Sequence, residues 1–282
     1  MADQVMTTAA ETSVLVPEIW SQQFYDVLLS ELPFSSVIDR TWSGEIQALG
    51  DTVKISSVPE FDPAVELAEG ARNDADAVTV TQQSLTINKR VAKDFIITNK
   101  SMMQSIPFVD KLRDLAVYSI MKKIESTIIS TTVPSASAPD HQIAYDSGST
   151  LAFADILEAK ELLDQQDVPE SNRHLCVDAP QANDLFNIEN FTSSDYISAN
   201  ANAPSQTGQL PPMIAGFMPH MTTLASGTSY FFHSTYLTMA MQGGMNIAQY
   251  DLGVDGKRAM RINVDVLYGL KQLDDERVVT IS

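Results

Sequence analysis

Two strand patterns in this sequence are separated by a segment that has little means of folding on itself. Residues 50–55 alternate after a Gly-Asp turn, and residues 85–91 form a second strand pattern. The connection of about thirty residues between them contains Pro59 and Pro63, which oppose a helix. A connection of this kind predicts an arm over residues 51–90 that lies on another surface.

The predicted arm is also strongly acidic. Its connection holds a single base, Arg72, among six carboxylates. The six acids are Glu60, Asp62, Glu66, Glu69, Asp74 and Asp76. Because such a segment buries little apolar surface of its own, we expect neighbours to order it.

Charge is distributed unevenly along the chain. Residues 1–88 hold 3 bases and 14 acids, whereas residues 89–123 hold 8 bases and 3 acids. The arm and the basic stretch are therefore complementary, and pairing between copies of the chain would guide assembly. The alternative is that both stretches are only solvated surfaces. The bases expected at such an interface are Lys89, Arg90, Lys93, Lys111, Arg113, Lys122 and Lys123.

Helical periodicity appears twice in the first half of the chain. From residue 16 to about residue 33, apolar side chains that include Trp20 and Phe24 lie on one side. This pattern predicts an amphipathic helix, and we add these two aromatic residues to the interface candidates. Between residues 107 and 133 an apolar residue recurs at every fourth position, which predicts the longest helix of the protein.

The second half of the chain predicts alternating helices and strands. Residues 134–149 form a linker rich in Pro, Ser and Gly, and residues 187–212 form a surface loop. Helices are expected from residue 153 to 162 and from residue 181 to 186. Strands are expected at residues 175–177, 213–217, 229–232, 237–241, 261–268 and 277–281.

Composition excludes several classes of protein. The chain has 18 Lys and Arg against 36 Asp and Glu, a formal net charge of −18, which argues against high-affinity binding to nucleic acid. Cys176 is the only cysteine, so no intrachain disulfide can form. There is no secretory N-terminus and no apolar run near the roughly 18 residues of a membrane helix. We therefore expect a soluble protein in a reducing cytoplasm.

The strongest candidates for a nucleophilic site are His174, Cys176 and Asp178, because a strand places all three on one face. Alternate strand residues lie about 6.6 Å apart at the backbone. A catalytic Cys–His pair instead requires contact at hydrogen-bond distance. We therefore expect Cys176 to be a buried structural residue.

The remaining motifs predict structure rather than chemistry. The other three histidines are isolated and have no metal-ligand spacing. Gly243-Gly244 predicts a turn, residues 251–256 predict a connection between strands, and the acids at 274–276 predict a solvated surface. We expect no cofactor, no metal site and no enzymatic activity.

The order of these elements resembles that of the tailed-bacteriophage major capsid proteins, whose Hong Kong ninety-seven capsid fold is also used by encapsulins. Residues 16–20 (Val-Pro-Glu-Ile-Trp) and 50–55 (Gly-Asp-Thr-Val-Lys-Ile) look like the family's N-terminal arm and the entry to its extended loop. Residues 105–133 resemble its spine helix, and residues 174–178 resemble the strand that opens its axial domain. Later segments that resemble the family lie at residues 209–210, 214–217, 266–269 and 277–279.

The resemblance implies an α+β fold with four parts. They are an N-terminal arm (1–48), an extended β-hairpin loop (49–100), a peripheral domain with a long spine helix (101–147 and 236–270), and an axial domain with a central sheet (148–235 and 271–282).

The resemblance also implies a structural function. The chain would be a major capsid protein that self-assembles through pentamers and hexamers into the icosahedral head of a tailed bacteriophage. The head would enclose packaged double-stranded DNA without sequence-specific binding, and acidic walls suit this role because DNA does not adhere to them. Expected partners are a separate scaffolding protein, a portal protein and a decoration protein, with assembly in the bacterial host cytoplasm.

Two alternatives to this function remain open from the sequence. One is an encapsulin-type shell, which would need an inner site for a cargo peptide. The other is a cytoplasmic thiol hydrolase that uses Cys176 and His174.

Overall fold

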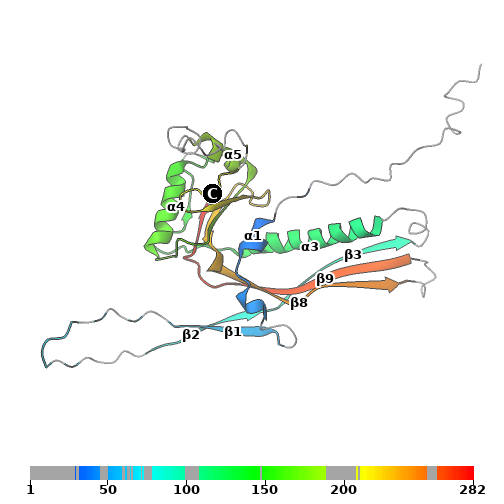
Figure 1. Ribbon diagram of the computed structural model, residues 1–282, viewed down its shortest axis with the longest axis horizontal. Coiled ribbons are helices and arrows are strands. Elements are labelled where there is room, and N and C mark those ends of the chain that lie inside the picture. The colour runs from blue at the N-terminus through cyan, green and yellow to red at the C-terminus, as the bar shows by residue number, and fades with distance from the viewer. Residues whose placement is uncertain are drawn as a thin grey trace, which may run out of the picture.

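In the computed structural model, a long hairpin projects from a body made of two sheets and their helices (Figure 1). The described residues are 29, 32–44, 50–58, 61, 64, 66–70, 72, 78–98, 108–146, 148–188, 208, 210–252 and 259–282.

The hairpin is the first large feature of the described chain. Its strands β1 (Thr52–Ser57) and β2 (Thr81–Thr86) pair antiparallel, and β1 confirms the first predicted strand. The strand expected at residues 85–91 is divided, because residues 85–86 end β2 and residues 89–91 begin a strand of another sheet. The described residues between the strands extend away from the body (Figure 1). We call β1, β2 and the residues between them the hairpin arm. Before it lie the short helix α1 (Pro33–Val37) and the 3-10 helix η2 (Thr41–Gly44).

A long three-stranded sheet carries the longest helix. Its antiparallel strands, in the order β3-β9-β8, are β3 (Lys89–Thr98), β9 (Ala259–Gln272) and β8 (Leu237–Asp251). Helix α3 (Phe108–Thr131) lies along this sheet and contacts β3 and β9. The predicted periodicity is confirmed, because every fourth residue of α3 from 116 to 128 is buried and Leu112 is half-buried. The buried residues are Ala116, Ile120, Ile124 and Ile128.

A second sheet of five strands forms the other half of the body. Its order is β4-β10-β7-β5-β6, and helices α4 (Phe153–Gln165) and α5 (Ala179–Asn187) accompany it. Its strands are β4 (Gln142–Ile143), β5 (Arg173–Val177), β6 (Met218–Met221), β7 (Ser229–His233) and β10 (Val278–Ile281). Its two faces contribute to separate apolar clusters, and one cluster is continuous with the core beneath α3.

The structure corrects the strand expected at residues 213–217. Ile214 and Phe217 exchange backbone hydrogen bonds of 2.8 Å in a tight turn. Ala215 and Gly216 between them have φ angles of 48° and 93°, a conformation that a strand does not contain. Strand β6 begins only at Met218. The apolar run was a buried turn, which periodicity alone does not distinguish from a strand.

Three smaller expectations also change. Pro33 begins α1 instead of ending a helix, consistent with proline's preference for the first helical position. The expected helix before it lies almost entirely outside the described residues. Gly243 and Gly244 do not form a turn but lie in a bulge within β8, where both have φ near +70°. The expected linker 134–149 contains the short strand β4.

Candidate functional site

The hairpin arm exposes apolar side chains along its length. Phe61 is 63% exposed and Val58 is 59% exposed, and Leu67, Val78 and Val80 are also open to solvent. An isolated two-stranded hairpin is marginally stable in water. Exposed apolar side chains gathered on such an element indicate a surface that contacts another molecule.

The root of the arm has a small core of its own. Ile55 of β1 and Leu85 of β2 are buried with Ala240 of β8. Partly buried residues that pack around them include Trp42, Val53, Ile87 and Leu273. The arm therefore projects from a fixed base on the three-stranded sheet.

Gly269 of β9 sets how closely the arm approaches this sheet. A Cβ atom at position 269 would lie 2.4 Å from the carbonyl oxygen of Thr86, at the end of β2. No side chain fits at that separation, so only glycine permits β2 to cross β9 here.

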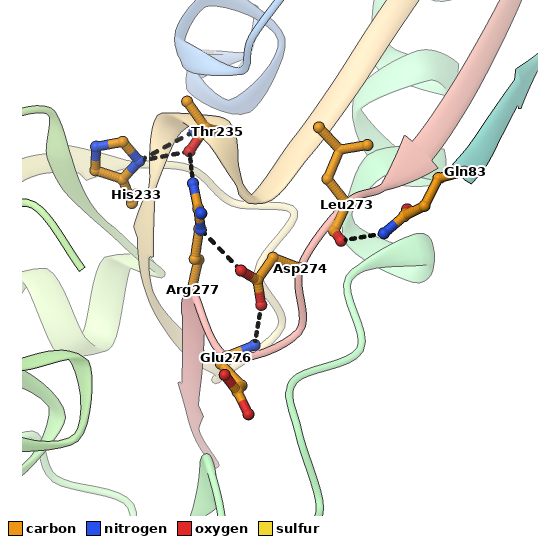
Figure 2. Close-up of polar contacts among 7 residues, drawn as sticks. All are labelled: Gln83, His233, Thr235, Leu273, Asp274, Glu276 and Arg277. Carbon is orange, nitrogen blue, oxygen red and sulfur yellow. Dashed lines mark hydrogen bonds and ion pairs between the residues drawn. The ribbon is translucent and has the colours of Figure 1, made fainter. Parts of the chain in front are cut away.

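A polar network joins the arm to the segment between the two sheets. We call residues 273–277, which connect β9 to β10, the junction segment. The side-chain amide of Gln83 in β2 donates to the carbonyl oxygen of Leu273 at 2.9 Å (Figure 2). Arg277 forms an ion pair of 2.8 Å with Asp274 and donates to the Thr235 hydroxyl at 2.8 Å. A cavity of about 250 Å³ lies among these residues and β1.

These contacts correct, for Asp274 alone, the expectation that the acids at 274–276 are simply solvated, whereas Asp275 and Glu276 are exposed as expected. Asp274 accepts from the backbone N–H of Glu276 while it pairs with Arg277 (Figure 2). Thr235 lies in the other connection between the sheets, η3 (Ser234–Tyr236). The network therefore fixes the two connections against each other.

A buried carboxylate holds α1 against α3. The two oxygens of Glu125 accept hydrogen bonds of 2.8 Å from the backbone N–H groups of Phe34 and Ser35. These donors belong to the first turn of α1, where backbone N–H groups lack helical partners. Burial raises the pKa of Glu125, because desolvation disfavours its charged form. This contact fixes the chain that enters the arm.

The predicted acidic candidates in the described part of the arm are exposed. Glu66 and Glu69 lie in the connection between β1 and β2, as does the base Arg72. Candidates outside the described residues are Trp20, Phe24, Glu60, Asp62, Asp74 and Asp76.

The predicted bases lie on β3 and α3. Lys111, Lys122 and Lys123 are exposed on α3, and Arg113 is half-buried there. On β3, Lys89 is half-buried and Lys93 is exposed. No ion pair described within the chain joins Glu66 or Glu69 to these bases. Glu66 and Glu69 thus do not satisfy the charge complementarity inside one subunit.

Arg90 has a role that sequence reasoning missed. It forms an ion pair of 2.7 Å with Asp265 on the neighbouring strand β9. Asn246 of β8 donates to the same carboxylate, so the three strands share one polar network. Arg90 therefore forms an ion pair within its own sheet.

The structure separates the candidates for nucleophilic catalysis. Cys176 is fully buried, and burial raises the pKa of its thiol well above the usual value. His174 lies 3.2 Å from His220, between Nδ1 and Nε2, and burial lowers its pKa to about 4. Asp178 caps α5 and accepts from Ala179. This confirms that Cys176 is a buried structural residue and corrects the expectation that His220 is isolated.

Neither a metal centre nor a membrane helix is found in the described part of the chain. No group of three or more His, Cys, Asp or Glu side chains could hold a metal ion there. No helix within these ranges is both long and apolar enough to cross a membrane.

Comparison with solved structures shows where this architecture occurs. A chain of Mycobacterium phage Che8 matches with a TM-score of 0.77 at 19% identity, over 95% of this chain and 97% of that chain. The capsid structure of the Cyanophage P-SCSP1u matches with a TM-score of 0.77 at 10% identity, over 100% of this chain and 96% of that chain. The mature capsid of bacteriophage PhiM1 matches with a TM-score of 0.70 at 13% identity, over 95% of this chain and 91% of that chain. No curated protein sequence matches the chain.

The two-sheet body, spine-like helix and projecting arm are those of a shell subunit with the Hong Kong ninety-seven fold. The family model for phage capsid proteins matches residues 113–282, and the chain belongs to that family. It is a major capsid protein that forms the phage head shell, a structural protein and not an enzyme. Its place is the capsid of the virion.

Some residues that build the site carried a weak signal in the sequence. Gly269 interrupts an apolar strand pattern, and an isolated glycine in a strand indicates a bulge or a close backbone approach. Glu125 and Gln83 carried no such signal, because their partners are distant in sequence.

Proposed function

We propose that the hairpin arm lies over a neighbouring subunit and that the chain builds its shell from pentamers and hexamers. The exposed apolar residues of the arm carry this proposal, because they have no core of their own beyond the arm root. In this arrangement residues 49–100 act as the extended loop, α3 belongs to the peripheral domain, and the five-stranded sheet belongs to the axial domain.

The proposed contents and partners of the shell follow from charge and from the family. A net charge of −18 suits a container for packaged double-stranded DNA, because acidic walls do not retain the polymer. We propose that a separate scaffolding protein and a portal protein act during assembly in the host cytoplasm, and that a decoration protein binds the finished shell.

Electron microscopy of the purified protein, alone and co-expressed with its scaffolding protein, tests the assembly proposal. We expect closed shells or rings of five and six subunits, and we expect the arm to resist protease only in these assemblies. A compact monomer at high concentration, with scaffold present and the arm already protected, would contradict the proposal. Shells filled with a protein cargo and never with DNA would favour the encapsulin-type alternative.

The interface candidates give a second test, which addresses charge pairing between the acidic arm and the bases of a neighbour. Glu66→Lys combined with Glu69→Lys should slow assembly at low salt, since both side chains are exposed and their reversal repels Lys122 and Lys123. Each exposed pair contributes only about 0–1 kcal/mol, but the shell repeats it in every subunit. Light scattering follows the assembly rate.

A matched control changes net charge by the same amount away from the arm. Glu158→Lys with Glu170→Lys, near α4, should assemble almost like the wild type. Reversing Lys122 and Lys123 to Glu should partly rescue the arm variant, and about 1 M salt should reduce the difference between variants. Identical rates for wild type and arm variant at low salt would show that exposed charges do not hold this interface.

A further inference from the structure

The outer edge of β8 pairs with no other strand among the described residues. In the three-stranded sheet β8 is a terminal strand, paired only with β9 among the described strands. The N–H of Leu252, directly after β8, donates to the carbonyl of Ala259 in β9. In an antiparallel pair, successive N–H groups along a strand point alternately toward the partner strand and away from it. Counting back from Leu252, the N–H groups of Ile247 and Gln249 therefore point away from β9.

The first half of β8 is covered, whereas no described segment pairs with the outer edge of its second half. Asp39 bridges to Thr238, and its carbonyl accepts from the N–H of Met239 at 3.0 Å. The glycine bulge then interrupts the strand between Gln242 and Met245. After the bulge, residues 245–251 resume pairing with β9. We call these seven residues the distal edge of β8.

Four other edge strands carry the devices by which proteins discourage strand addition, whereas β2 has neither a proline nor a charge but crosses β9 at Gly269. In the five-stranded sheet, β6 contains Pro219, and β4 has only 2 residues. Strand β3 carries three exposed charged residues, Arg90, Lys93 and Asp94. Strand β1 carries the exposed base Lys54. Each of these four edges therefore has a proline, a charge or a short length that opposes pairing.

The distal edge of β8 lacks these devices. Its sequence, Met-Asn-Ile-Ala-Gln-Tyr-Asp, contains no proline and no base, and its one charge is at the last position. Ile247 is 44% exposed and Tyr250 is 56% exposed. An edge of this length, uncharged except at Asp251 and partly apolar, is a template for another strand.

We propose that the distal edge of β8 pairs by backbone hydrogen bonds with a strand of a second copy of this chain. A second copy is the occupant because a capsid protein meets many copies of itself in the shell. With Asp251 as its one charge, the edge also gives little electrostatic selection for a polyanion or a basic partner. This inference rests on shell assembly but does not depend on the arm or on its charge pairing.

Hydrogen exchange of the wild-type protein in assembled and unassembled forms tests this pairing directly. The amides of Ile247 and Gln249 should exchange quickly in the unassembled subunit. In shells they should exchange on the order of 100-fold more slowly, because each becomes a donor to the added strand. The amide of Ala248, which donates to β9 in both forms, is the internal reference.

Substitution at position 249 gives the matching assembly test. Gln249→Pro removes one outward N–H but no donor to β9, whereas Gln249→Ala removes the same side chain and keeps that N–H. We expect at least a tenfold lower shell yield for the proline variant and a nearly normal yield for the alanine variant. Thermal unfolding of both subunits checks that neither has lost its fold.

The possible outcomes separate this inference from the proposed function. Shells in which Ile247 and Gln249 exchange as fast as in the free subunit would overturn strand pairing and leave shell assembly intact. A wild-type protein that never assembles would contradict the proposed assembly itself. Equal shell yields for the two folded variants, with fast exchange of the Ile247 amide in the shells of both, would likewise overturn the pairing.

Discussion

Replacing Gly269 by alanine is expected to dislodge the hairpin arm from the body. The new Cβ would lie 2.4 Å from the Thr86 carbonyl oxygen and within 3.1 Å of the Ile87 backbone, and neither group can move as a flexible side chain would. Strand β2 must therefore lift from β9, which opens the small core that buries Leu85 and Ile55. Overpacking of this kind costs about 1–3 kcal/mol.

The effect on the arm should exceed the effect on the rest of the subunit. We expect Gly269→Ala to make the arm root sensitive to limited proteolysis and to prevent most shell assembly. Gly44→Ala is the matched control, because a Cβ at position 44 meets no atom within 4 Å and the residue has no positive φ. If Gly269→Ala resists protease as well as the wild type and gives a normal shell yield, then β2 can shift without consequence.

The elements with strong local patterns were predictable from the sequence. The four-residue spacing that includes Ile120, Ile124 and Ile128 predicted α3 because one face of that helix is buried along its length. The hairpin arm was predictable for the opposite reason, since the prolines and acids between its strands left nothing to fold locally.

The errors arose where a local pattern has two structural meanings. A Gly-Gly pair permits positive φ in a turn and equally in a bulge, and only pairing with β9 shows that Gly243 lies inside a strand. In segment 213–217, Ile214 and Phe217 belong to a turn, and both side chains pack in the apolar cluster where those of a strand would also be buried. Positive φ accounts for the glycine pair in either structure, and burial accounts for the apolar run in either, so composition could not separate the alternatives.

The candidate site was predictable only as a surface. Exposed charges on the arm and on α3 could be expected from sequence, because solvated side chains depend little on distant partners. The contacts that fix the arm root join residues far apart in the chain, such as Gln83 with Leu273. No local pattern encodes such a pair, so the sequence indicated the arm but not how it is held.

Removing the carboxylate of Glu125 is expected to have the largest effect on subunit stability. Glu125→Ala leaves the N–H groups of Phe34 and Ser35 buried without an acceptor, at about 1–3 kcal/mol for each group. It also frees α1, which carries the Phe34 ring stacked 5.3 Å from Phe232. We expect the free energy of unfolding in urea to fall by about 2–6 kcal/mol. Asp114→Ala, an exposed acid on the same helix, should change it little.

Glu125→Gln separates the hydrogen bonds from the charge. The amide oxygen still accepts one bond, but its NH₂ group faces the second donor, so we expect an intermediate loss of stability. Because burial raises the pKa of Glu125 above 4.5, the folded protein binds this proton more tightly than the unfolded chain. The carboxyl group's contribution to stability is therefore complete below the pKa that Glu125 has in the unfolded chain. It is lost as pH rises through the higher pKa that Glu125 has in the folded protein. The stability difference between wild type and Glu125→Gln should accordingly be larger at pH 5 than at pH 8. A difference that grows with pH would instead show that the carboxylate is stabilised by its two donors more than burial disfavours it.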